Sequence, residues 1–150
     1  MASIGPSRFS KSLKVAATVS AYRVVTPDTA LSSGFIRCIQ IPTETSIILG
    51  ISQDYADTTS VQFQAVPVAS FGYGKIAAGA SVSAGAILSF STATAYGIES
   101  GYSGSHATLT FTTVGAKVPK TIGVALQNAS LTDAVIECFV NLGNLSIRVA

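Results

Sequence analysis

Charged side chains are scarce in this sequence. Asp, Glu, Lys and Arg make up 11% of the 150 residues, against roughly a quarter of an average soluble domain. The net charge is only +2, and the nine Lys and Arg residues are scattered, so the sequence does not indicate nucleic-acid binding. A surface with so little charge suits a protein that works inside an assembly, because a free monomer usually needs more charge to stay in solution. The alternative is a Thr- and Ser-rich β protein without such a role.

Residues that carry catalysis or bind metals are equally scarce. His106, the only histidine, follows a serine in a Gly/Ser-rich segment, which does not supply the separate base and nucleophile of a hydrolase. The spacing of Asp54 and Asp57 is typical of an Asx turn, and a calcium loop needs a denser run of oxygen ligands. Cys38 and Cys138 are too few for a zinc site or a disulfide framework, and we expect both to be reduced and buried. The sequence therefore predicts a protein that is not an enzyme and that has no metal and no cofactor.

Long apolar runs are missing as well. No run approaches the 18 or more apolar residues that a membrane helix needs. The apolar stretch at residues 15–21 is interrupted by Thr18 and Ser20, which makes a poor secretory signal. We therefore expect no contact with a membrane.

The sequence does contain β-strand patterns. Apolar and polar residues alternate along 61–65, 107–114 and 133–142, and in the last of these Val135 and Phe139 share the polar face. The first of these strands is expected to end at Pro67. No window sustains a helical period, and no repeat is long enough to indicate a solenoid. Short strands separated by Gly, Pro, Asn and Asp predict an all-β fold, a compact antiparallel β-sandwich or barrel-like domain. Further strands are expected at 13–25, 35–41, 47–51, 120–126 and 145–149.

Glycines mark the stretch from residue 75 to residue 126. Gly79 and Gly85 predict turns between short strands, because glycine takes positive φ without a Cβ clash. Gly123, inside a predicted strand, indicates a bulge or a close approach of two backbones. Between them lies a Gly/Ser-rich loop at 95–106 that offers an adaptable contact surface. Its candidate partner-binding residues are Tyr96, Tyr102 and His106, although a merely mobile loop would have the same composition.

The first twelve residues predict an extended arm, followed by a single β domain at 13–150. Few apolar side chains are available to fold the arm back onto a core. Basic residues precede the first acid, Asp28, so the arm has the charge to lie on an acidic partner surface. Loose, solvated charges near a terminus are the alternative. The candidate docking residues are Ile4, Arg8, Phe9, Lys11 and Lys14.

Three segments together resemble a known family. They are Ala78-Gly-Ala-Ser-Val-Ser-Ala-Gly-Ala-Ile-Leu88, Lys120-Thr-Ile-Gly-Val-Ala-Leu126 and the closing strand 133–140. This pattern resembles the small head-decoration (cement) proteins of tailed bacteriophages, in which an AG-rich turn leads into a strand and an IGVAL strand follows later. The likeness extends over roughly residues 63–142.

The resemblance implies a structural protein of the virion, made in the host cytoplasm. It would bind the outer capsid surface at junctions between subunits of the major capsid protein, stabilise the shell, and associate with itself as a dimer or trimer. The alternative is a receptor- or carbohydrate-binding β module of a phage head or tail fibre. Such a module needs aromatic platforms and acids in a concave site, so the lack of tryptophan and the predicted arm favour decoration.

Overall fold

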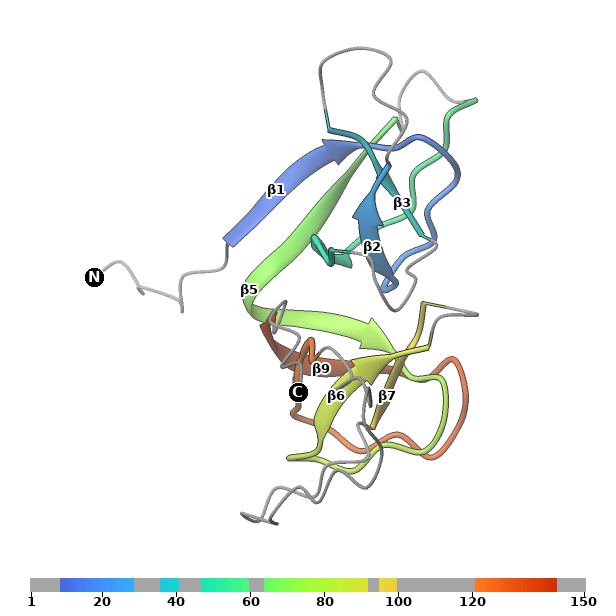
Figure 1. The fold of residues 1–150 in the computed structure, drawn as a ribbon. Coiled ribbons are helices and arrows are strands. Elements are labelled where there is room, and N and C mark those ends of the chain that lie inside the picture. Colours follow the sequence, from blue (N-terminus) through green and yellow to red (C-terminus); the bar gives the residue numbers. More distant parts are fainter. Residues whose placement is uncertain are drawn as a thin grey trace, which may run out of the picture.

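The structure, a computed structural model, describes residues 9–28, 36–40, 47–59, 64–91, 95–99 and 121–142. Within these ranges every regular element is a strand, and nine strands join one sheet. Every pairing between named strands is antiparallel, and the sheet curls into a barrel-like shape (Figure 1). The predicted all-β, antiparallel, barrel-like fold is confirmed. The strands are β1 (Phe9–Lys14), β2 (Val24–Pro27), β3 (Cys38–Ile39), β4 (Gly50–Ser52), β5 (Ala65–Ala77), β6 (Ile87–Phe90), β7 (Gly97–Glu99), β8 (Gly123–Ala125) and β9 (Val135–Asn141).

β5 is the longest described strand, with 13 residues, and it runs through both lobes of the molecule (Figure 1). Its first part pairs with β1 and β4, and from Phe71 to Ala77 it pairs with β9. The partner changes next to Gly72, whose φ of 89° is a conformation that glycine adopts more readily than other residues. β5 therefore divides the described chain into a first half, residues 9–71, and a second half, residues 71–142.

The two halves repeat one arrangement of strands. The neighbour order is β1-β5-β4-β2-β3 in the first half and β5-β9-β8-β6-β7 in the second. Outside the strands, the antiparallel bridge between Val19 and Ala56 has its counterpart between Val82 and Ala129. The distances from backbone N to backbone O in both bridges are 2.8 to 2.9 Å. The halves are thus equivalent strand for strand, and β5 belongs to both.

A short sequence repeat accompanies this duplication. Ala17-Thr-Val-Ser-Ala21 and Ala80-Ser-Val-Ser-Ala84 occupy equivalent positions around the two bridges. Each is followed by a residue with positive φ, Tyr22 at 61° and Gly85 at 86°. The turn predicted at Gly85 is therefore confirmed, and the first half makes the same turn with a tyrosine.

A glycine occupies the same place in each half, Gly50 on β4 and Gly123 on β8. An added Cβ would lie 2.3 Å from the Ala69 carbonyl oxygen at Gly50 and 2.0 Å from the Phe139 carbonyl oxygen at Gly123. Their φ angles, 150° and 155°, also favour glycine. The close backbone approach predicted for Gly123 is confirmed, and it occurs twice.

Buried apolar side chains form two clusters. The smaller one lies within the first half. The larger one fills the second half and also includes four residues of the first half, so the second half packs against one side of the first and the halves share a core. The smaller cluster contains Val15, Val19, Val25, Cys38, Ala56, Val66 and Val68. The four residues that the first half contributes to the larger cluster are Val24, Ile48, Ile51 and Ala69.

Four predicted strands are shorter than expected. Those predicted at 47–51 and 120–126 are the three-residue strands β4 and β8. The strand predicted at 13–25 is wrong, because β1 ends at Lys14 and β2 begins only at Val24. Between them the backbone bonds to other segments, as where Ala16 N donates to Cys38 O at 3.0 Å, and then turns at Tyr22. Of the strand predicted at 35–41, only Cys38–Ile39 is a strand among its described residues, 36–40.

The break expected at Pro67 is wrong, because β5 passes through this residue. Pro67 lacks an N–H, but its carbonyl accepts a hydrogen bond from Gln53 N at 2.8 Å, so the ladder continues. Gly79 lies just after the end of β5, and it is not one of the glycines with a positive φ.

The alternation predicted at 133–142 is confirmed by β9, whose residues Ile136, Cys138 and Val140 are buried while Val135 and Glu137 are exposed. Cys38 and Cys138 are buried and free, as predicted. The strands predicted at 107–114 and 145–149 lie outside the described residues.

Candidate docking surface

The predicted arm, residues 1–12, overlaps a strand. β1 begins at Phe9 and pairs with β5, with Lys11 opposite Val68 and Lys14 opposite Ala65. Both lysines are exposed. The strand from Phe9 to Lys14 is therefore joined to β5 within the chain, so only residues 1–8 of the predicted arm precede the sheet. The candidate residues Ile4, Arg8, Tyr102 and His106 lie outside the described residues.

Tyr96, predicted to contact a partner, bonds within the chain. Its hydroxyl donates to a carboxylate oxygen of Asp133, and the Arg23 guanidinium lies 3.8 Å from the centre of its ring. Arg23 Nη2 is 3.1 Å from Asp133 Oδ1. Arg23 belongs to the first half and the other two residues to the second, so these three side chains, the clasp, join the halves.

The clasp changes the acidity of Tyr96. The hydrogen bond to the Asp133 carboxylate, followed by partial burial, raises the pKa of Tyr96 above its ordinary value of 10.0. The charge of Arg23 acts in the opposite direction. The phenol is therefore protonated, and can donate to Asp133, throughout the neutral pH range.

An apolar surface that the sequence analysis did not propose lies on the second half. Phe139 on β9 packs edge-on between two aromatic rings of β5, 5.5 Å from the centre of Phe71 and 5.6 Å from that of Tyr73. Phe71 and Tyr73 are 45% and 46% exposed, and Val124 on the neighbouring β8 is 36% exposed. Exposed apolar groups that adjoin in this way mark interaction sites more often than scattered ones do.

Strand register aligns three of these residues, Tyr73, Phe139 and Val124, with Ile87 in one row across the sheet. Ile87 pairs with Val124, Val124 with Phe139, and Phe139 with Tyr73. Together they form the open row. Ile87 and Phe139 are half-buried, while the other two are exposed.

The first half contains the equivalent row, and there it is covered. Val24 pairs with Ile51, and Ile51 with Ala69. These three residues, the covered row, are all 0% exposed. They belong to the larger core cluster, because the second half packs over them. The same position in the repeat is thus core in one half and surface in the other.

A partial signal for the open row was present in the sequence. Val135 and Phe139 break the polar face of the strand predicted at 133–142, and Phe71-Gly-Tyr-Gly74 alternates large and small residues. Two apolar residues on an otherwise polar face indicate a second surface to be covered. What the sequence did not show was that these segments are neighbours.

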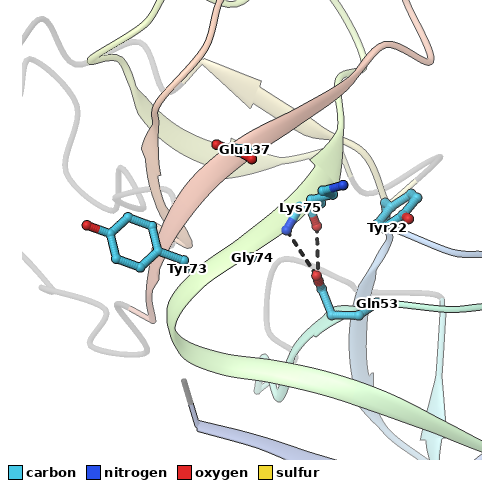
Figure 2. A pocket seen from close by; sticks show the side chains of 6 residues that line it. All are labelled: Tyr22, Gln53, Tyr73, Gly74, Lys75 and Glu137. Atoms are coloured by element: carbon cyan, nitrogen blue, oxygen red, sulfur yellow. Dashed lines mark hydrogen bonds between the residues drawn. The ribbon is translucent and has the colours of Figure 1, made fainter. Parts of the chain in front are cut away.

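A cleft of about 380 Å³ lies where β5 bends (Figure 2). The side chain of Gln53 spans the two halves there, with Nε2 donating to Lys75 O at 3.1 Å and Oε1 accepting from Lys75 N at 3.0 Å. In Figure 2 the ring of Tyr73 lies on the other side of β5 from Tyr22, so the two rings do not face each other. The lining residues are Tyr22, Gln53, Tyr73, Gly74, Lys75 and Glu137.

Among the described residues, no group of three or more His, Cys, Asp or Glu is placed to hold a metal ion. Over the same ranges, no helix has the length and apolar character to cross a membrane.

The chain is thus an all-β protein of two equivalent curled halves with an exposed apolar face. No protein-family model matches it, and no curated protein matches it. Among solved structures, it is similar to the head fiber gp8.5 N base of bacteriophage phi29. The TM-score is 0.57 at 12% sequence identity, over 95% of this chain and 100% of that chain. At this identity the likeness shows a shared fold.

Proposed function

We propose that the chain is a structural protein of a bacteriophage virion that attaches to the head. The observation that carries this proposal is the shared fold with a head fibre base, which spans 95% of this chain and the whole of that base. The sequence resemblance to head-decoration proteins supports the same class. Its partner would be the major capsid protein, which it would bind at subunit junctions on the outer surface of the shell.

The low charge of the chain and its exposed apolar side chains support a binding role and not a catalytic one. Only 11% of the residues are charged, and the second half exposes Phe71, Tyr73 and Val124. Burying such side chains contributes about 25 cal/mol per Å² of apolar surface removed from water. We therefore propose a binding role in the assembled particle, stabilising the shell, with no enzymatic activity.

The location is tested on phage particles purified by density gradient. Gold-conjugated antibody against the chain is expected to label heads in negative-stain images, and mass spectrometry is expected to find the chain in the same fraction. Absence of the chain from particles, or labelling of tails alone, would overturn the proposal.

Residues 1–8 would provide an attachment arm. Since Phe9–Lys14 pair with β5, the deletion should remove residues 2–8 and leave β1 intact. We expect the melting temperature to stay within about 2 °C, because no described core residue is lost, and retention on particles to fall. Full occupancy by the truncated chain would show that the arm is not the anchor.

A carbohydrate-binding fibre module is the second candidate. The cleft at the bend of β5 contains Tyr22, Lys75 and Glu137, which are groups that bind sugars. It lacks a pair of facing aromatic rings among its lining residues (Figure 2), so we rank it second. A glycan array distinguishes the two: saturable binding that Glu137→Gln abolishes would favour the fibre module, and no binding would favour attachment.

A further inference from the structure

The covered row of the first half is the equivalent of the open row, and it shows what kind of surface packs over such a row. In the first half, the covered row packs under the beginning of the second half. Ala69 lies against the second part of its own strand, β5, where a Cβ added to Gly74 would be 3.4 Å from the Ala69 Cβ. The backbone N–H of Val24 donates to the Ala95 carbonyl at 2.9 Å. The surface that covers this row is therefore built from the second part of β5 and the segment before β7.

The first half has the equivalent surface, and Ile36 and Lys11 within it are exposed. The parallel bridges Val15–Cys38 and Ala78–Gly97 align β3 with β7, so that Ile36 is the counterpart of Ala95. Ala95 is 1% exposed, but Ile36 is 59% exposed. The same alignment makes Leu13, on β1, the counterpart of the buried Ile76.

The receiving edge of the first half consists of Lys11, Leu13 and Ile36. Lys11 is exposed and Leu13 half-buried, and Lys11 is the counterpart of Gly74. Where Ala69 meets Gly74 inside the chain, the equivalent contact between chains pairs Phe139 with Lys11. A lysine stem can lie across an aromatic ring and keep its ammonium group in water. Because Phe and Lys are larger than Ala and Gly, the two backbones lie further apart at this contact than they do within the chain.

We infer that the open row of one copy binds the receiving edge of a second copy, so that the chain associates head to tail. The contact would repeat between chains the packing that joins the two halves within a chain. Because the contact joins two different surfaces, a bound pair still has one free open row and one free receiving edge. The series therefore closes into a ring or continues. The inference does not rest on attachment to a phage head, since it concerns the free protein.

Sedimentation velocity over the micromolar to millimolar range tests the inference. We expect the wild-type sedimentation coefficient to rise with concentration. Val124→Asp, in the open row, and Ile36→Asp, in the receiving edge, should each remain monomeric. Leu131→Asp is the matched control, because Leu131 is 71% exposed and lies outside both surfaces; it should associate like the wild type. Tyr73→Ser tests the open row independently if Val124→Asp fails to fold, as circular dichroism would show.

Mixing distinguishes head-to-tail association from a symmetric dimer. Val124→Asp keeps its receiving edge and Ile36→Asp keeps its open row. An equimolar mixture should therefore form a 1:1 dimer and grow no further. A mixture that stays monomeric, or a wild type that is monomeric at every concentration, would overturn the inference. If the wild type is monomeric at every concentration and attaches to heads, while Val124→Asp does not attach, the open row binds the shell protein and not a second copy.

Discussion

Ile51 and Val124 hold equivalent places in the two halves, each one residue after a glycine that lies against the next strand. Ile51 is 0% exposed and Val124 36% exposed. Their local backbone is the same, with antiparallel partners on both sides. The difference comes from what is stacked above each of them: the second half covers Ile51, and no described segment covers Val124 to that extent. The same position in the repeat therefore contributes to the core in the first half and is available for binding in the second.

The largest effect is expected from the two equivalent glycines. Gly50→Ala and Gly123→Ala should each lower the free energy of unfolding by roughly 4 kcal/mol or more, because a Cβ adds a backbone clash to a strained φ. The two carbonyl oxygens would lie 2.3 and 2.0 Å away. Urea unfolding followed by circular dichroism measures the loss. Gly85→Ala is the control, since it has a φ of 86° but nothing within 4 Å, and it should cost about 1–2 kcal/mol. Equal losses at all three positions would contradict the close approach.

The next effect compares the covered and open rows directly. Ile51→Ala should cost about 2–5 kcal/mol, since it leaves a cavity in the shared core. Val124→Ala should cost less than about 1 kcal/mol in dilute solution. Both are measured by chemical unfolding at low protein concentration. If the two substitutions lower the free energy of unfolding equally, then Val124 is as closely packed as Ile51 and the open row is not an exposed surface.

A smaller effect is expected from the clasp. Arg23→Met should lower the free energy of unfolding by about 1 kcal/mol, because it removes a partly exposed ion pair and a cation–π contact. Asp133 is 65% exposed, which limits the contribution of the pair. A double-mutant cycle with Asp133→Asn isolates the coupling. Arg37→Met, whose partner Asp28 is in the same half at 2.9 Å, serves as the comparison within one half. A coupling free energy of zero between Arg23 and Asp133 would show that the clasp does not stabilise the contact between the halves.

The smallest effect is expected at the turn where the halves differ in residue type. Tyr22 has a φ of 61° where the second half has Gly85. Tyr22→Gly should raise the free energy of unfolding by up to about 1 kcal/mol, because relief of the left-handed strain exceeds the added flexibility of glycine. A thermal melt measures this. A clear loss of stability would mean that the tyrosine side chain contributes more at the cleft than its backbone costs.

The all-β fold could be predicted because the strand signals are local. Alternation along 133–142, the turn glycine Gly85 and the packed glycine Gly123 each depend on nearby residues and the general needs of a sheet. The strand break expected at Pro67 was wrong because β5 uses the proline carbonyl, which depends on a distant Gln53. Exact strand ends in the first half failed for the same reason: bonds to other segments decide them.

The docking surface could not be predicted in the same way. The duplication is visible in sequence only as five residues, Ala17–Ala21 and Ala80–Ala84, because apolar residues replace one another freely in a core. The open row combines residues from four strands, β5, β6, β8 and β9, whose adjacency follows from topology. Tyr96 was predicted to contact a partner, but its bond with Asp133 depends on the same topology.

Thiol labelling at the open row tests the central claim most directly. Burial raises the pKa of Cys38 to about 11 and that of Cys138 to about 12, so both native thiols should react slowly and give a low background. Val124→Cys places a new thiol in the open row, and Leu131→Cys places one on exposed surface outside it. We expect the thiol introduced at position 124 to react quickly in dilute protein and to become protected as the concentration rises, while the one at position 131 reacts quickly throughout. A thiol at position 124 that reacts at the same rate at every concentration would contradict the claim that a second copy covers this face.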